Sequence, residues 1–178
     1  MSVDLLQIIE RIHAALPSLL MLVKAVGILI GVTLVIMSIR LAMKIKDMGR
    51  HAGEWKQPAV TFLIGITLRS MAMLIDALSR TVFGSAPPAA GDIMSYAPVT
   101  IGAFASNDAT VTAMITGITA IIMSVGVVAV MRGLLMLNGA AKGAQGRSTF
   151  GSGLTHVIAG TVAINFPTFV GLAEKLIT

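Results

Sequence analysis

The sequence contains no cysteine and little charge. Of its 178 residues only 12% are charged, while 56% are hydrophobic and 4% are aromatic. A soluble domain carries about 25% charged residues, so this chain has too few ionisable groups to cover a globule of its size. The missing cysteine excludes a disulfide framework, a thiolate nucleophile and a cysteine-ligated metal site. The high hydrophobicity excludes a disordered chain. We therefore expect much of the surface to face lipid.

Long stretches without charge predict four membrane-type helices. The runs from Ala109 to Met131 and from Ser148 to Ala173 hold 23 and 26 uncharged residues. A helix needs about 20 residues to cross about 30 Å of hydrocarbon. Those two runs suffice, and two earlier runs suffice if they tolerate Lys24 and Arg69. The predicted helices cover residues 17–45, 57–82, 109–138 and 152–176.

The predicted fold is all-α, with two helical hairpins after an amphipathic helix. Residues 1–16 carry apolar side chains at helical spacing with polar ones mostly opposite, which is typical of a helix lying on a membrane or on a neighbouring subunit. Pro17 and Pro58 suit the first turn of a helix, and Asn138-Gly139 suits a helix end. The remaining divisions are a first hairpin at 17–83 with a basic loop at 40–56, a Pro- and Gly-rich outer loop at 84–108, and a second hairpin at 109–178 with a basic loop at 132–147.

Positive charge is concentrated in the two hairpin loops. Each of the loops at 40–56 and 132–147 has a net charge of +3, while the outer loop contains two acids and no base. Because basic loops stay on the cytoplasmic side, we expect both termini to face outward from a bacterial inner membrane. Asp4 stands where a secretory signal would carry basic residues, so no cleaved leader is expected.

The two halves share one plan of helix, basic loop and helix. At an offset of 95 residues several small or β-branched positions coincide. A set this small over some 46 aligned positions is close to chance, so the sequence alone leaves the repeat unproven. The identical pairs are Gly31 with Gly126, Val32 with Val127, Val35 with Val130 and Gly65 with Gly160, and Trp55 coincides with Phe150.

No motif in the chain points to catalysis or to a metal. His13, His51 and His156 have no partner at helical spacing, and the metalloprotease, Walker and nucleophile-elbow patterns are absent. The turn Gly151-Ser-Gly153 is interpreted as a flexible entry into a helix, and His156 is expected to bond a carbonyl or a hydroxyl group. The predictions are no enzymatic activity, no metal and no cofactor other than a bound phospholipid.

Two charges lie deep inside the second apolar segment. A charge at mid-membrane costs about 2.5–3.5 kcal/mol on insertion scales and is usually paired or functional. Arg69 and Asp76 are about 10.5 Å apart along a helix, so they cannot pair directly. One interpretation is that Arg69 snorkels or pairs with an acid on another helix. The other is that Arg69 or Lys24 holds an anionic lipid headgroup or specifies a subunit contact.

Glycines are placed for close helix packing. Small residues let membrane helices approach each other closely. The residues predicted to line such contacts are Gly27, Gly31, Gly117, Gly126 and Gly160.

Several stretches resemble a known family of small membrane proteins. They are the four-helix plan, the segment from Arg132 to Leu137, the Gly-rich basic segment from Asn138 to Arg147, and the segment from Gly160 to Pro167. This pattern resembles the small four-helix membrane proteins of IncI-type conjugation systems and of the related Dot/Icm type IVB secretion systems, the TraQ and IcmC/DotE kind. The resemblance covers nearly the whole chain and implies a place in conjugation machinery.

The chain also resembles two conjugative pilins in tandem. Such pilins are hairpins of two apolar helices whose basic loop lines the filament lumen after assembly, and each subunit binds a phospholipid. The chain departs from them in its four helices and its long outer loop. The resemblance implies a pilus subunit that forms a homo-oligomer or filament with anionic phospholipid and contacts other type IV secretion components, without sequence-specific nucleic acid binding. The alternatives are a non-polymerising inner-membrane component of the same machine and a small channel or transporter.

The lipid-headgroup and lumen-facing assignments follow from these resemblances and from the charge pattern. Bases along a DNA-conducting lumen would bind DNA by releasing counterions, and bound lipid phosphate would cancel that attraction. The residues assigned to this role are Arg40, Lys44, Lys46, Arg50, Lys56, Arg132, Lys142 and Arg147, with Arg69 as a further contributor.

Overall fold

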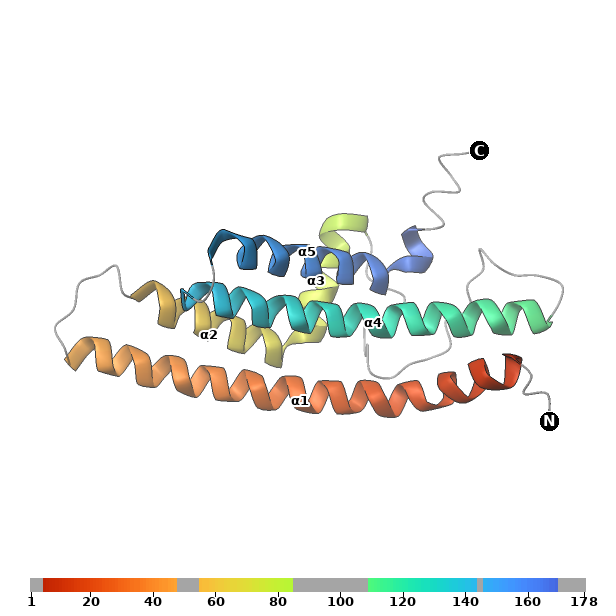
Figure 1. Cartoon of the computed structure of the whole chain (residues 1–178), viewed down its shortest axis with the longest axis horizontal. Helices are drawn as coiled ribbons and strands as arrows, with labels where there is room; N and C mark the ends of the chain where they lie inside the picture. The colour runs from red at the N-terminus through yellow and green to blue at the C-terminus, as the bar shows by residue number, and fades with distance from the viewer. Residues whose placement is uncertain (1–4, 48–54, 85–108, 144–145, 170–178) are drawn as a thin grey trace.

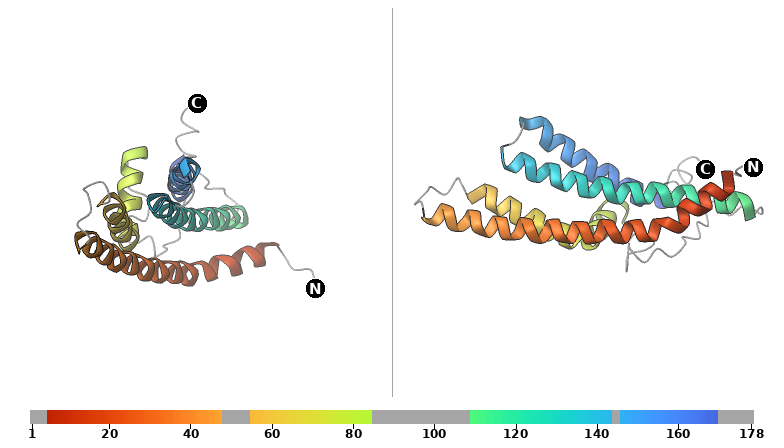
Figure 2. Two further views of the ribbon diagram at one scale, coloured as in Figure 1. Left: turned by 60° about the vertical axis from the view of Figure 1, so that its left-hand side comes forward. Right: turned by 60° about the horizontal axis from the view of Figure 1, so that its bottom comes forward.

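The computed structural model describes residues 5–47, 55–84, 109–143 and 146–169, and all of its regular elements are helices. In Figure 1, α1 and α4 run in the same direction and lie side by side, and α2 and α5 run back alongside them. Figure 2 shows α3 leaving the line of α2 toward α5. The helices are α1 (Leu5–Asp47), α2 (Lys56–Arg69), α3 (Met71–Phe83), α4 (Ala109–Ala141) and α5 (Gly146–Ile164).

Two helices are long and apolar enough to cross a membrane. They are the segments Ala14–Asp47 of α1 and Gly117–Ala141 of α4. The bent pair α2 and α3 would make a third crossing if the two helices act as one span, and the apolar part of α5 is shorter. The prediction of an all-helical chain is thus confirmed for the described residues, and two of the four predicted membrane-type helices are long and apolar enough to cross a membrane.

The N-terminal region differs from the prediction because α1 is one continuous helix of 43 residues. Its length is about 65 Å at 1.5 Å per residue. Pro17 lies inside this helix rather than in a first turn, so the amphipathic segment at 1–16 and the helix predicted from residue 17 are joined from Leu5 onward. An interior proline removes one helical hydrogen bond, and the apolar neighbours on either side continue the helix nonetheless.

The helix predicted at 57–82 is broken at Ser70. There α2 ends and α3 begins with a bend of 92°. The Ser70 backbone N–H and the Ser70 hydroxyl both donate to the carbonyl oxygen of Ile66, at 2.9 and 3.0 Å. A serine that bonds back to a carbonyl in its own helix commonly bends that helix. In the pair formed by α4 and α5, α5 is likewise interrupted by a turn residue, Asn165. Residues 166–169 are helical again.

The predicted basic loops are largely helical. α1 continues to Asp47 and α4 to Ala141, so most of the charges assigned to loops lie on helices. Asn138-Gly139 therefore does not end α4, and the left-handed residue after it is Gly143, with φ of 75°. Charge marks where a helix meets water and does not mark where it ends, which explains the error.

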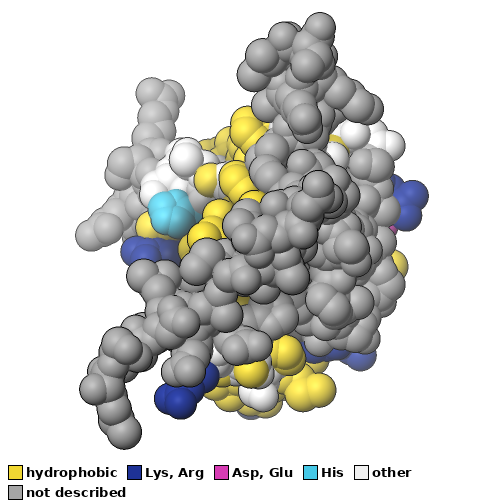
Figure 3. Space-filling view, turned by 90° about the vertical axis from the view of Figure 1, so that its right-hand side faces the viewer, with side chains coloured by type: hydrophobic (Ala, Val, Ile, Leu, Met, Phe, Trp, Pro, Cys, Tyr) yellow, Lys and Arg dark blue, Asp and Glu magenta, His cyan; other side chains and the backbone are white. Residues whose placement is uncertain are grey.

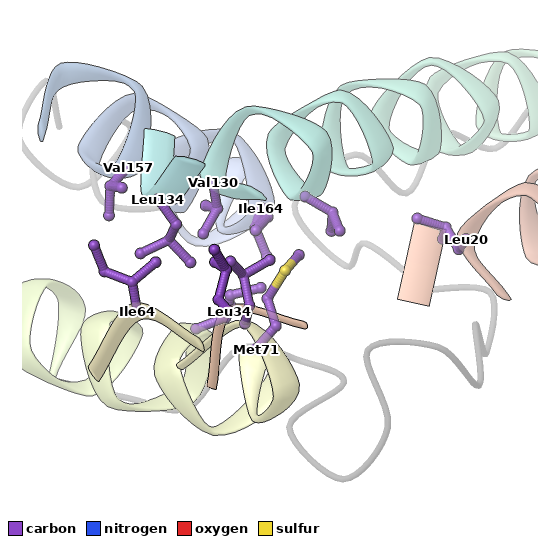
Figure 4. Close-up of a cluster of buried hydrophobic side chains, with 11 residues drawn as sticks. Leu20, Leu34, Ile64, Met71, Val130, Leu134, Val157 and Ile164 are labelled. Atoms are coloured by element: carbon purple, nitrogen blue, oxygen red, sulfur yellow. The ribbon is translucent and has the colours of Figure 1, made fainter. Parts of the chain in front are cut away.

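The core lies where the two helix pairs meet. Figure 4 shows Leu34 from α1 and Ile64 from α2 pointing toward Val130 and Leu134 of α4. Val157 and Ile164 of α5 are buried in the same cluster. The cluster therefore joins both pairs into one unit.

Within each pair the helices touch at glycine. A Cβ atom at Gly31 would lie 2.7 Å from the carbonyl oxygen of Gly65, and one at Gly126 would lie 2.7 Å from that of Gly160. Real Cβ atoms do not come so close, so only glycine permits these approaches. A second such contact joins Gly133 to Gly153, where the same distance is also 2.7 Å.

The contacts repeat at the 95-residue offset. A Cβ atom at Gly65 would lie 2.9 and 3.1 Å from the Cγ2 and N atoms of Val35. A Cβ atom at Gly160 would lie 2.8 and 2.9 Å from the same two atoms of Val130. The two helix breaks obey the same offset: the N–H of Asn165 bonds the carbonyl four residues earlier, as at Ser70, and the Asn165 side chain bonds that carbonyl too. The structure thus supplies the evidence of repetition that sequence identity lacked.

Candidate lipid-binding pocket and basic end

A pocket lies between α1 and the α2–α3 bend, and its charged lining residues are both cations. Lys24 comes from α1, and Arg69 is the last residue of α2. The rest of the lining is apolar and includes Leu68, Met71 and Ile75. The pocket therefore combines positive charge with an apolar floor.

The helix break creates this pocket. Because α3 leaves α2 at 92°, it no longer follows α1. Gly27 enlarges the space, since a Cβ atom there would have its nearest neighbours, including the carbonyl oxygen of Leu68, only at 3.8 Å. Gly27 is thus a lining residue of the pocket, in ordinary contact with its neighbours, and not a site of close helix approach.

An acid beside the pocket pairs with a base of its own helix. Asp76 directly follows the lining residue Ile75 and pairs with Arg80, with 3.1 Å between its carboxylate and the Arg80 Nε atom. This pair, which the sequence analysis missed, engages the acid with a base of its own helix. The spacing of four residues was the signal that could have revealed it. The guanidinium of Arg69 can bond a phosphate through two parallel N–H groups.

The other predicted cations gather toward one end of the molecule, which we call the basic end. It lies at the left of Figure 1, where α1 and α4 finish and α2 and α5 begin. Seen from the opposite end, hydrophobic side chains reach the surface with scattered charged ones (Figure 3). Arg147 lies in the first turn of α5, and Arg50 is outside the described residues. The exposed cations of this end are Arg40, Lys44, Lys46, Lys56, Arg132 and Lys142.

Only some of the contact glycines were predicted from the sequence. The structure brings Gly31, Gly126 and Gly160 into the close helix contacts and buries Gly117 in α4. It adds partners that were not singled out, namely Gly65, Gly133 and Gly153. The spacing of seven residues from Gly126 to Gly133 and from Gly153 to Gly160 could have revealed Gly133 and Gly153, because residues seven apart share a helix face.

A buried polar contact ties α3 to the end of α5. The Asn165 side-chain amide donates to the Ser79 hydroxyl at 2.7 Å and to the Thr161 carbonyl at 2.8 Å. Ser79 in turn donates to the carbonyl of Ile75 at 2.7 Å. The expectation for His156 is confirmed, since its Nδ1 atom lies 2.8 Å from the Ser152 carbonyl oxygen.

Comparison of the chain with protein-family models, with curated proteins and with solved structures finds no match.

Proposed function

We propose that the chain is a structural, non-enzymatic subunit of a conjugative type IV secretion apparatus, most concretely a pilus subunit that assembles with anionic phospholipid. The observation that carries this proposal is the pocket that sets Lys24 and Arg69 over an apolar floor. In this proposal a phosphate group lies against the guanidinium of Arg69 at the positively charged side of the pocket, and an acyl chain covers Leu68, Met71 and Ile75. Large exposed apolar side chains along α1, such as Leu22, Leu29 and Ile36, support burial in lipid or against further subunits.

The basic end supports a pilus subunit whose cations line a lumen and bind lipid phosphate. The two helix pairs point the same way (Figure 1), so both sets of cations converge at one end. If that end turns toward a lumen, lipid phosphate neutralises it and keeps transported DNA from adhering. Before assembly the same end faces the cytoplasm, and both termini face outward, as the positive-inside rule requires. In this scheme α1, α2 with α3, α4 and α5 form two hairpins in the inner membrane.

The lipid test uses purified assemblies, lipid extraction and mass spectrometry. We expect near-stoichiometric anionic phospholipid in the unaltered protein and its loss in the double variant Lys24→Gln/Arg69→Gln. Arg80→Gln is the matched control, because Arg80 is a cation of the neighbouring helix that pairs with Asp76 outside the pocket. A lipid-free assembly that still supports DNA transfer would contradict the proposal.

The assembly test images sheared extracellular material from a producing strain. Filaments made of this chain would support the pilus role. Confinement of the protein to inner-membrane fractions would instead favour a non-polymerising component of the same machine.

The orientation test uses single cysteines, since the chain has none of its own. We expect Ala89→Cys to react with an impermeant thiol reagent in intact spheroplasts and Ala144→Cys to remain unlabelled. Both positions lie outside the described residues. The reverse pattern would overturn the orientation and the lumen assignment with it.

A further inference from the structure

The contact between the two helix pairs is one-sided. α4 packs against both α1 and α2, whereas among the described residues α1 makes no comparable contact with α5. In a two-fold arrangement every contact has a reciprocal one. The two pairs are therefore related head to tail: the α4–α5 pair presents a helix face, and the α1–α2 pair presents the surface that receives it.

A head-to-tail contact leaves two matching surfaces without a partner in the chain. One is the face of α1 that corresponds to the docking face of α4. The other is the surface of the α4–α5 pair that corresponds to the receiving surface of the α1–α2 pair. The 95-residue offset, fixed by the glycine contacts and by the two helix breaks, identifies both surfaces.

The docking face of α4 is buried and its counterpart on α1 is open. Val127 and Leu134 of α4, which belong to the core cluster shared with α1 and α2, expose 2% and 6% of their surface. The corresponding α1 residues expose 42% and 48%. They are equally apolar, so the counterpart keeps the character of a docking face. These α1 residues, which we call the α1 face, are Val32 and Ile39, with Ile36 in the place of Met131.

The receiving surface shows the same contrast. In the α1–α2 pair it includes Leu34 and Leu68, which expose 6% and 1%. The corresponding surface of the α4–α5 pair, which we call the second groove, is lined by exposed or half-buried residues. Several of these are alanines, which leave room for a helix. The second groove comprises Ile118, Ile122, Val125, Ala129, Ala159 and Ala163.

We propose that the second groove binds the α1 face of another copy of this chain, in the way that α4 docks on the α1–α2 pair. The docking of α4 is the internal precedent for this contact, because it joins corresponding surfaces within one chain. Repeating a head-to-tail contact produces a ring or an open filament. The inference deepens the proposed function by naming the contact through which subunits would assemble.

One internal contact gives the position of the test. A Cβ atom at Gly27 would lie 3.8 Å from the Sδ atom of Met131. The corresponding intermolecular neighbours are Ile122 of one copy and Ile36 of the next. A protein carrying Ile36→Cys and Ile122→Cys, treated in its native membranes with a short thiol cross-linker, is expected to give a ladder of dimers, trimers and larger species.

Three controls make the result decisive. Gly27→Cys/Met131→Cys is expected to cross-link within one chain and keep the mobility of a monomer. Leu63→Cys/Ile122→Cys measures random collision, because Leu63 is 64% exposed on α2 and lies outside the α1 face. Membranes that contain the two single variants Ile36→Cys and Ile122→Cys together are expected to stop at dimers.

A ladder no stronger than that of the Leu63 control would overturn the inference and would mean that lipid covers the α1 face. The outcome is separable from that of the proposed function. Filaments that contain the chain but do not cross-link through Ile36 and Ile122 would keep the function and reject this contact. A ladder in membranes of a strain that makes no filaments of the chain would keep the contact and reject the pilus role.

Discussion

The α1–α2 pair and the α4–α5 pair follow one plan but are held together with different strength. Both have a close glycine contact near the middle, Gly31 with Gly65 and Gly126 with Gly160. Seven residues further on, the α4–α5 pair has a second glycine contact, where the α1–α2 pair has the buried residues Ser38 and Pro58. The same arrangement of two helices thus forms with either one or two close glycine contacts, and the α4–α5 pair, which has two, is the more tightly packed.

The largest effect is expected from leucine at the central glycines of the tighter pair. Gly126→Leu or Gly160→Leu places side-chain atoms where a backbone carbonyl lies 2.6–2.7 Å from the Cβ position. Overpacking of this kind costs about 3 kcal/mol or more, so folded protein should be lost from membranes. Gly31→Leu should cost less, because the α1–α2 pair has a single close contact. Thermal unfolding in mild detergent measures the order, and equal losses in the two pairs would contradict it.

The second glycine contact gives a matched pair of alanine variants within α4. Gly133→Ala should destabilise the protein by about 1–3 kcal/mol, since its Cβ would meet the Gly153 carbonyl oxygen at 2.7 Å. Gly139→Ala meets no atom within 4 Å and should stabilise the helix by up to about 1 kcal/mol. Opposite shifts of the melting temperature are the expected result. Shifts of the same sign would mean that the close contact between Gly133 and Gly153 does not determine the effect on stability.

The two helix breaks provide the next comparison. Asn165→Ala removes a buried donor from the Ser79 hydroxyl and should cost about 1–3 kcal/mol. Ser70→Ala removes an exposed bond to the carbonyl of Ile66 and should cost less than about 1 kcal/mol. Detergent unfolding curves of the two variants measure the difference. A larger loss for Ser70→Ala would show that the bend is stabilised mainly by its own side chain.

The smallest effect is expected on α3. Arg80→Gln removes an exposed ion pair with Asp76, and pairs of this spacing contribute about 0.3–0.5 kcal/mol. The melting temperature should hardly move, and added salt should remove what difference there is. A loss comparable to that of Asn165→Ala would place the pair in a less polar environment than its exposure indicates.

The sequence predicted the helical class and four membrane-type helices, of which two, in α1 and α4, are long and apolar enough to cross a membrane. Long uncharged runs indicate these two because they reflect the apolar medium around a helix. It assigned a basic loop from residue 40 onward for the same reason: Lys44 and Lys46 are exposed while still in α1. It missed the break at Ser70 because serine is common inside helices, and the bend depends on a side chain that bonds its own backbone. Pro167 after Asn165 was a clearer signal of the second break.

The candidate site was predicted in its chemistry but not in its shape. The depth of Lys24 and Arg69 in apolar segments singled them out, whereas their place in one pocket depends on the bend that follows Arg69. The second contact glycines were visible only as a heptad spacing. The repeat itself escaped sequence comparison, because the two halves share glycine at the close backbone approaches and few other identical residues.

The contact of α4 with the α1–α2 pair lies within one chain, so its formation does not depend on protein concentration. Because residues 85–108 connect the two pairs covalently, this joint forms at a fixed effective concentration that dilution cannot change. Joints between separate copies form only as subunit density allows. In the proposed assembly every second joint is therefore complete before two chains meet. Dilution of such an assembly is expected to stop at the single folded chain, with its two helix pairs still together.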